Sequence, residues 1–263
     1  MTSESEHAAE FYDQVWKSYG HLDAASPAAF HRRRLIVELS LRAKPDARTV
    51  LDAGCGQGQL LGQLARAFPR ASLAGADVSE QSLTDTRKKW PSAELFLLDL
   101  VRPNFEEEHR SHLAKYDLIV CSEVLEHIPD TVLAAKNLRS LLSPRGAVVV
   151  TVPGGKMSRF DELIGHQRHF SPRELRRVLE AAGYGVTQAF GWGFPFHNLY
   201  RTAVRVASRA TMREPSGEAS QNRGGLTRVL SGAYGLFGRG LIPLYYLNLS
   251  RWGEQTLAVA RQS

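Results

Sequence analysis

Three ionisable side chains crowd into residues 121–130, which read CSEVLEHIPD. Glu123, Glu126 and His127 could hold a divalent ion, act as acid–base groups or border a cofactor pocket, since such positions share a face on one continuous helix. Pro129 follows them and disfavours a helical conformation at the residue before it. We therefore expect at most one helical turn here, with a new helix beginning after Pro129. A metal site stays open at this point.

A strand followed by a glycine-rich turn is predicted by VLDAGCGQG at residues 50–58. Glycine lets a backbone turn tightly and come close to a ligand, because no Cβ intervenes. The glycines of the turn are Gly54, Gly56 and Gly58. A dinucleotide site carries a further glycine five positions after the first, where this chain has Gln59. Asp52 at the entrance would repel a pyrophosphate but could bind a cationic group, so the loop favours a ligand that carries one.

Carboxylates stand at the predicted ends of three consecutive strands. Asp77 ends the second strand, where it could accept hydrogen bonds from ribose hydroxyls, and Asp99 ends the third, where it could meet the exocyclic amine of adenine. With Asp52 they form a set at the edge where open parallel sheets bind ligands. Each residue alone could equally be a capping or turn residue. Together they indicate a nucleoside site.

The elements that must position these side chains alternate between 48 and 190. Short apolar, β-branched runs are separated by helical stretches, which predicts an α/β fold with a buried parallel sheet. The predicted strands are 48–54, 71–78, 93–99, 116–122, 146–153, 184–190 and a last strand within 255–263. Residues 1–47 read as an N-terminal helical lid and 191–254 as an inserted basic and apolar cap. The cofactor-binding core would thus consist of 48–190 and 255–263.

The cap segment carries the net charge of the chain. Between 197 and 251 lie eight arginines and two glutamates, an excess of six positive charges that equals the net charge of +6. Arg201, Arg205 and Arg209 recur every four residues and predict a cationic stripe on a helix. The stripe could be a solvated face, a nucleic-acid surface, or a contact with a membrane or an anionic, lipid-linked acceptor. We favour a substrate cap over RNA binding, because no RNA-binding module accompanies the arginines.

Composition places the chain among ordinary globular proteins. It has 263 residues, of which 43% are hydrophobic and 23% charged, values typical of a domain with a real core. The two cysteines, Cys55 and Cys121, form no CxxC pair, and the polar first residues do not resemble a signal peptide. The longest apolar run, at 241–249, is too short to span a bilayer. We therefore expect a cytoplasmic protein, with peripheral membrane contact as an open alternative.

Five segments, in their order and spacing, resemble the class I S-adenosylmethionine-dependent methyltransferases: VLDAGCGQG, GADVS, LLDL, YDLIVCSEVLEHIPD and LLSPRGAVVVTVP. The resemblance is greatest to the ubiquinone-biosynthesis O-methyltransferases and extends over about 30–190. It implies a Rossmann-like, mostly parallel sheet of seven strands with helices on both faces. It also implies S-adenosyl-L-methionine as the cofactor, whereas it covers 191–254 poorly.

The resemblance also implies which residues hold the cofactor. The glycine turn would surround its methionine part, Asp77 its ribose and Asp99 its adenine, with Ser122 and Glu123 on the sulfonium side. The full implied set is Tyr12, Tyr19, Arg34, Asp52, Gly54, Cys55, Gly56, Gly58, Asp77, Val78, Asp99, Leu100, Ser122 and Glu123. The two tyrosines would belong to an aromatic lid over a site at the strand ends.

Catalysis of methyl transfer requires an aligned nucleophile and exclusion of water, and a hydroxyl acceptor must also lose its proton. Histidine is the side chain best suited to accept that proton near neutral pH. The candidates are His127, His166 and His169, of which the last two could instead hold a loop over the cofactor. We expect methylation of a small-molecule or lipid-like acceptor, with oxygen as the preferred atom.

Two other functions remain open on the sequence. Glu123, Glu126 and His127 match the ExxEH pattern of the small-RNA 2′-O-methyltransferases, in which His166 or His169 would complete a divalent-metal site. The chain could also bind S-adenosylmethionine without turnover, as the partner of another protein. Our preferred interpretation is a methyltransferase of a small acceptor without a catalytic metal.

Overall fold

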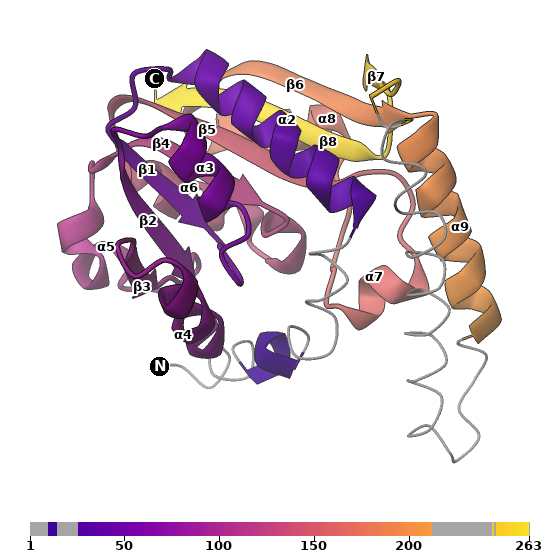
Figure 1. Cartoon of the computed structure of the whole chain (residues 1–263), viewed down its shortest axis with the longest axis horizontal. Helices are drawn as coiled ribbons and strands as arrows, with labels where there is room; N and C mark the ends of the chain where they lie inside the picture. Colours follow the sequence, from indigo (N-terminus) through magenta and orange to yellow (C-terminus); the bar gives the residue numbers. More distant parts are fainter. Residues whose placement is uncertain (1–9, 15–25, 212–243, 245, 263) are drawn as a thin grey trace.

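The computed structural model describes residues 10–14, 26–211, 244 and 246–262. Helices cover both faces of one sheet (Figure 1). The strands are β1 (Thr49–Ala53), β2 (Ser72–Asp77), β3 (Glu94–Leu97), β4 (Tyr116–Ser122), β5 (Leu142–Pro153), β6 (Tyr184–Phe194), β7 (Leu249–Arg251) and β8 (Gln255–Gln262). Their order across the sheet is β3-β2-β1-β4-β5-β8-β6-β7. The seven predicted strands are present, and the short β7 adds an eighth at the edge.

The first five strands pair in parallel, whereas β8 runs antiparallel between β5 and β6. A parallel sheet is buried on both faces, so its strands need apolar side chains on both sides. In β4, Leu118 and Val120 lie in one apolar cluster, while Ile119 and Cys121 lie in the other. The expected Rossmann-like, mostly parallel sheet is therefore confirmed.

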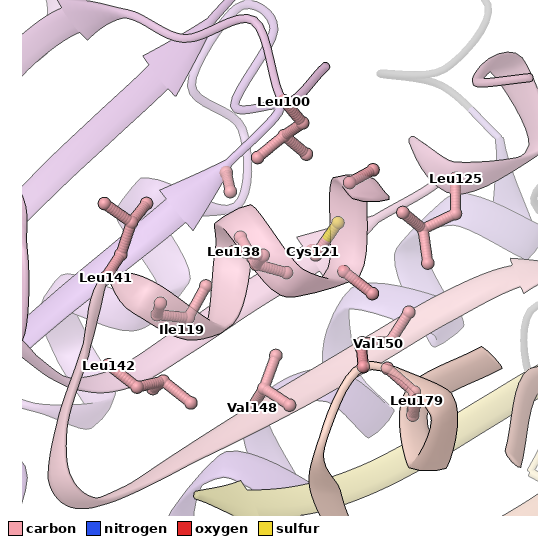
Figure 2. Packing of buried hydrophobic residues seen from close by; sticks show 14 of the residues in the cluster. Leu100, Ile119, Cys121, Leu125, Leu138, Leu141, Leu142, Val148, Val150 and Leu179 are labelled. Carbon is pink, nitrogen blue, oxygen red and sulfur yellow. The ribbon is translucent and has the colours of Figure 1, made fainter. Parts of the chain in front are cut away.

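Two helical layers complete the core. The helices are α2 (Pro27–Ala43), α3 (Leu61–Ala67), α4 (Glu80–Lys89), α5 (Phe105–Glu108), η1 (Arg110–His112), η2 (Leu125–His127), α6 (Thr131–Ser140), α7 (Arg159–Leu163), α8 (Pro172–Ala181) and α9 (Phe196–Thr211). α2 and α3 cover the face of Leu118, while Leu138 of α6 and Leu179 of α8 pack with Ile119 on the other (Figure 2). Among the helices of the described residues, none is both long and apolar enough to cross a bilayer.

The long helix α2 differs from the lid expected for residues 1–47. Its side chains Ile36 and Leu39 are buried in the apolar cluster that covers β4 and β5, and the helix contacts α3 as well. An amphipathic helix of this kind contributes to the core because one face is removed from water. α2 is thus a layer of the core, and only the short helical segment 10–14 lies apart from it as a candidate lid.

The cap expected at 191–254 begins and ends inside the sheet. β6 continues to Phe194, beyond the boundary placed after 190. β7 pairs antiparallel with the end of β6, so residues 249–251 also belong to the sheet edge. α9 follows β6 and packs beside α7 (Figure 1). The stretch 212–243, which the sequence assigned to the middle of the cap, lies outside the described residues.

Two arginines of the predicted cationic stripe bind carboxylates of the chain itself. Arg201 forms a bidentate pair with Asp161, with both N–O distances at 3.1 Å, and Arg205 bonds both carboxylate oxygens of Glu254. Bidentate pairs fix geometry as well as charge. α9 is therefore fastened to α7 and to the turn before β8, and two of the stripe's charges are balanced within the molecule. The side chain of Arg209 lies outside what the structure describes.

A reciprocal capping box starts α8: Ser171 Oγ accepts from the Glu174 N–H at 3.3 Å, and Glu174 Oε2 accepts from the Ser171 N–H at 2.7 Å. Ser171→Ala removes the first acceptor, and we expect the free energy of unfolding to fall by about 1 kcal/mol. Chemical denaturation measures the change. Arg173→Ala, at an exposed position of the same helix, is the control and should alter it by less than ~0.5 kcal/mol. An unchanged value for Ser171→Ala would show that the box does not stabilise α8.

Candidate active site

The carboxyl ends of β1 to β5 meet at one edge of the sheet, because these strands are parallel. The chain passes outward from β1 to β2 and β3, then returns to the other side of β1 with β4 and β5. The loops that follow β1 and β4 therefore lead in opposite directions from this edge. Open α/β sheets bind their ligands at such a point, and the predicted strand-end residues all stand there.

The turn after β1 has a backbone that requires glycine. Gly54 and Gly58 have φ values of +81° and +74°, in the left-handed region that favours glycine. A Cβ at Gly54 would overlap the side chain of Val124, and one at Gly58 would lie 2.8 Å from Thr86 Cγ2. Because Val124 and Thr86 approach the backbone so closely, only glycine fits at positions 54 and 58.

Asp77 holds this turn against the end of β2. Its Oδ2 accepts from the Gly56 N–H at 2.8 Å and its Oδ1 from the Ser79 N–H at 3.0 Å. Asp13, in the helical segment 10–14, accepts from Ser79 Oγ and so brings this segment to the same strand end. Burial raises the pKa of Asp77, while the N–H donors oppose the rise. Each oxygen retains acceptor capacity, so the predicted contact with ribose fits.

Asp52 is a buried carboxylate in β1, with 2% of its surface exposed. Its Oδ2 accepts no hydrogen bond from any residue that the structure describes. Burial, and then the charge of Asp77, raises the pKa of Asp52 to about 7. A buried carboxylate without a donor is costly unless a cation pairs with it. Asp52 therefore fits the predicted contact with the cationic methionine part of the cofactor.

A pocket of about 240 Å³ opens beside the end of β3. Val78, Leu97 and Asp99 line it together with His109 and His112. Apolar walls with a few placed polar groups are typical of sites for small organic ligands. Val78 and Asp99 thus have the surroundings that the adenine end of the cofactor requires.

Two residues of the implied cofactor set bury their side chains in apolar clusters. Cys55 packs with Leu61 and Leu83, and burial raises the pKa of its thiol. Leu100 lies in the main core (Figure 2), and its carbonyl accepts from Asn137 Nδ2 at 2.9 Å. A cofactor contact at these two positions would have to come from the backbone.

Glu123 connects three elements at the end of β4. Its Oε1 accepts from Gln255 Nε2 at 2.9 Å and from Thr151 Oγ1 at 3.1 Å, and its Oε2 lies 3.4 Å from Arg32 of α2. Its φ of +57° is uncommon for a residue other than glycine. Ser122 shares a hydrogen bond with the same threonine. These contacts hold the Glu123 carboxylate against β5 and β8.

The arginine that meets Glu123 is Arg32, two residues before the predicted Arg34. Arg34 instead pairs with Glu38 at 2.8 Å and lies over the ring of Tyr246, 4.5 Å from its centroid. Residues two apart on a helix do not face the same way. The predicted cofactor contact of Arg34 would require it to leave both of these partners.

The helical segment 10–14 brings Tyr12 over the second half of the site. Its ring packs edge-on to His127, with 5.2 Å between the centroids. Burial, and then the charges of Glu126 and Asp77, raises the pKa of the Tyr12 hydroxyl. Tyr12 therefore lies between the cofactor side of the site and the residues that follow β4. Tyr19, the other predicted lid residue, lies outside the described residues.

The three predicted acid–base histidines lie together. The rings of His127 and His166 have centroids 4.7 Å apart, and His166 Nδ1 lies 3.3 Å from His169 Nε2. Gln167 joins the segment after β4 to the segment before α8. Its N–H donates to the Glu126 carbonyl, and its side chain donates to the His127 carbonyl. We call Glu126, His127, His166 and His169 the histidine cluster. Their roles in catalysis stay predictions.

Burial sets the protonation of the histidine cluster. It lowers the pKa of His127 and of His169, and together with the neighbouring His127 it lowers that of His166 to about 3. It raises the pKa of Glu126 well above the usual value, and Glu123 adds to this effect. Because desolvation disfavours charge, the three imidazoles are neutral at pH 7.

Three further residues shape the site without having been predicted from the sequence: Arg32, Asp161 and Gln255. Asp161 accepts from the N–H and hydroxyl of Ser158 and from Arg201. The S-x-x-D spacing of a capping box is a local signal that could have pointed to it. Gln255 reaches Glu123 only through the pairing of β8 with β5, for which no local pattern exists.

The family of the chain follows from its sequence and agrees with this geometry. A family model described as a methyltransferase domain matches residues 28–189. The match covers more than half of the chain, which therefore belongs to this family. With its sheet order and its glycine turn, the protein is a class I S-adenosylmethionine-dependent methyltransferase.

Similar proteins act in several chemistries. A trans-aconitate 2-methyltransferase of Variovorax paradoxus (strain S110) is 31% identical over 126 residues, 48% of this chain and 46% of that protein. A ubiquinone biosynthesis O-methyltransferase of Aeromonas salmonicida (strain A449) is 28% identical over 176 residues, 60% of this chain and 72% of that protein. The chain thus spans about half the length of the first of these relatives.

The fold is shared with a 1,6-didemethyltoxoflavin-N1-methyltransferase of Burkholderia thailandensis, solved with 1,6-didemethyltoxoflavin and S-adenosylhomocysteine bound. The TM-score is 0.58 at 14% identity, and the alignment covers 100% of this chain and 91% of that one. Identity this low shows the fold alone, since one fold hosts many functions.

S-adenosyl-L-methionine is the cofactor of this class, and the residues present fit it. The Asp52 Oδ2 atom, which has no donor among the described residues, suits its cationic methionine part. Val78 and Asp99, which are predicted cofactor contacts, line the pocket beside the end of β3. When bound, it supplies an electrophilic methyl group on a sulfonium.

Loss of the Asp77 carboxylate should weaken cofactor binding. Asp77→Ala removes the predicted ribose acceptor and releases the Gly56 N–H, so we expect the Kd for S-adenosylmethionine to rise at least about tenfold. Titration calorimetry measures the Kd. Asp85→Ala, which removes a surface carboxylate paired with Lys88 on α4, is the matched control. Equal affinity of the two variants would refute the ribose assignment.

The affinity for S-adenosylmethionine should increase as the pH rises through about 7, the pKa of Asp52. Below this pH the carboxyl carries a proton that must leave before it can pair with a cation, whereas above it the carboxylate is already formed. The gain should approach about tenfold per pH unit below the pKa and level off above it. Calorimetry at about pH 6 and about pH 8 measures the gain. Asp52→Asn should abolish the Asp52-dependent part, and a profile identical to that of the native protein would contradict the assignment.

Proposed function

We propose that the chain transfers the methyl group of S-adenosyl-L-methionine to an oxygen atom of a small-molecule or lipid-like acceptor. The observation that carries this proposal is the histidine cluster, which lies under Tyr12 beside the end of β4. A hydroxyl acceptor must lose a proton during transfer, and neutral imidazoles are suited to receive it. One of the relatives is named an O-methyltransferase, in agreement with this choice.

The residues of segment 10–14 would exclude water from the reacting atoms. The rings of Phe11 and Tyr12 pack edge to face at 5.2 Å, and Tyr12 packs on His127. Asp13 fastens the segment to Ser79 at the end of β2. Closure of this kind holds the acceptor in line with the methyl group and keeps side reactions with water low. The proton of the acceptor would pass to an imidazole nitrogen of the histidine cluster.

We further propose that the acceptor is apolar over much of its surface. Beside the site, α9 exposes Leu199 and Val206, and the turn between β7 and β8 exposes Trp252, which is 71% accessible. Exposed apolar side chains in one region mark contact surfaces for ligands, membranes or proteins. A lipid-like acceptor presented at a membrane surface would use them. The internal pairing of Arg201 and Arg205 makes these two arginines less available for an RNA backbone.

Turnover with a panel of acceptors tests the proposal. Phenols and carboxylates that carry apolar chains should release S-adenosylhomocysteine, whereas amines of the same shape should not. His127→Asn should lower kcat about 100-fold or more, with the calorimetric affinity for S-adenosylmethionine unchanged. Methylation confined to amines would refute the oxygen assignment. Absence of S-adenosylhomocysteine with every acceptor and with cell extract would favour a binding protein without turnover.

A further inference from the structure

The carboxylate of Glu126 is buried where no donor meets it. The residue is fully buried, and neither oxygen accepts a hydrogen bond from any residue of the described ranges. Its nearest basic atom is His166 Nε2, 4.0 Å from Oε1, which is beyond hydrogen-bond distance. A buried carboxylate in such surroundings calls for a proton or for a cation.

A chain of hydrogen bonds fixes which nitrogen of His166 carries its lone pair. His169 Nδ1 lies 3.2 Å from the Gly155 carbonyl, and a carbonyl can only accept, so this nitrogen is protonated. In the neutral ring, His169 Nε2 is then an acceptor, and it receives the hydrogen of His166 Nδ1 at 3.3 Å. His166 Nε2 therefore presents a lone pair, and it faces the Glu126 carboxylate.

The same logic applies to His127. Its ring lies close to the Gly165 carbonyl, whereas its Nδ1 has no hydrogen-bond partner among the residues described. The nitrogen that faces the carbonyl must carry the proton, so Nδ1 carries the lone pair. Metal-bound histidines typically donate their other ring N–H to a carbonyl, which fixes the tautomer in this way.

With Glu126 ionised, three acceptors thus converge with no donor among them: Glu126, His127 and His166 offer ligand atoms that all lie within 4.8 Å of one another. We infer that these three residues bind a divalent transition-metal ion. Zinc bonds to nitrogen and oxygen are about 2.0–2.1 Å long, so two ligands of one ion lie at most about 4.2 Å apart. The observed spacing requires only a small contraction. Two imidazoles and one carboxylate suit Zn²⁺, Mn²⁺ or Fe²⁺.

The neighbouring set of Asp161, His166 and His169 has the same spacing but a different chemistry. Asp161 Oδ2 accepts from Ser158, and both of its oxygens accept from Arg201. Although burial opposes ionisation, Arg201 and the Ser158 donors hold the pKa of Asp161 below its usual range. Its carboxylate is thus already satisfied by a cation. Asp161 and His169 are therefore positioning residues around His166 and not ligands.

The ligand set also differs from the ExxEH pattern read in the sequence. Glu123, the first residue of that pattern, is held by Arg32, Gln255 and Thr151 on the side of β5 and β8. It lies outside both groups of residues whose ligand atoms converge. Where the proposed O-methylation holds, an ion at the cluster would bind the acceptor oxygen and lower the pKa of its hydroxyl. It would act in place of proton transfer to His127 or His166, because the ion would take the lone pairs of both rings. This last role rests on the proposed function, whereas binding of the ion does not.

Metal binding by the untagged full-length protein tests the inference. After treatment with a chelator, the protein is dialysed against Zn²⁺ or Mn²⁺, and bound metal is measured by plasma mass spectrometry. We expect about one ion per chain, and at least about tenfold weaker binding by Glu126→Gln and by His166→Ala. Glu180→Gln, which alters an exposed carboxylate of α8 paired with Arg176, should bind as the native protein does.

Two outcomes overturn the inference: no uptake of either ion by the native protein, or native affinity in the Glu126→Gln variant. Circular dichroism shows whether the Glu126→Gln variant folds. If it does not fold, metal binding by the His166→Ala variant, which is altered in the loop before α8, decides the test. Co²⁺ substitution adds a spectrum that should change on loss of either histidine ligand. Calorimetry with S-adenosylmethionine on metal-free protein keeps the two proposals apart. A protein that binds the cofactor and no metal refutes only the metal site, and one that binds metal and never methylates oxygen refutes only the function.

Discussion

Strands β1 and β4 are covered by apolar layers on both faces, so a charged side chain is tolerated only where a strand leaves the sheet. This constraint gathers Asp52, Asp77 and Glu123 at one edge and leaves each of them poorly hydrated. Two of the three obtain their hydrogen bonds from the chain, Asp77 from the glycine turn and Glu123 from β5, β8 and α2. Asp52 Oδ2 has no such partner among the described residues, which leaves it available for the predicted contact with the cationic end of the cofactor.

The same burial shifts the pKa values of carboxyl groups and of imidazoles in opposite directions, because it disfavours the charged form of each. At the cofactor half it raises the pKa of carboxyl groups, so that Asp52 titrates near neutrality. At the acceptor half it lowers the pKa of imidazoles, so that the rings stay neutral and keep their lone pairs. Tyr12 contacts His127 of the second half, and the charge of Asp77 in the first half contributes to its raised pKa. Segment 10–14 thus lies between the buried carboxylates of the first half and the imidazoles of the second.

Sequence reasoning succeeded where one local rule decides position. The ends of parallel strands meet at one edge, so the places of Asp52, Asp77 and Asp99 could be predicted from strand order alone, and Pro129 correctly limited the preceding turn to η2. Positions that depend on packing could not be predicted in this way. Whether Arg32 or Arg34 meets Glu123 depends on the rotation of α2, which its core contacts fix. The burial of α2 and the pairing of Arg201 with Asp161 likewise depend on distant partners.

β8 lies inside the sheet, between β5 and β6, although it follows every other described strand along the chain. β6 finds its described partners only in β7 and β8, both of which are made after it. The nucleoside half, built on β1 to β3, depends on pairings between strands that are neighbours in sequence, and contacts of shorter sequence separation form faster than distant ones. Gln255, in contrast, arrives only with β8, and its bond to Glu123 completes the contacts that Thr151 and Arg32 begin. During synthesis on the ribosome, this topology would complete the cofactor half first and the acceptor half last.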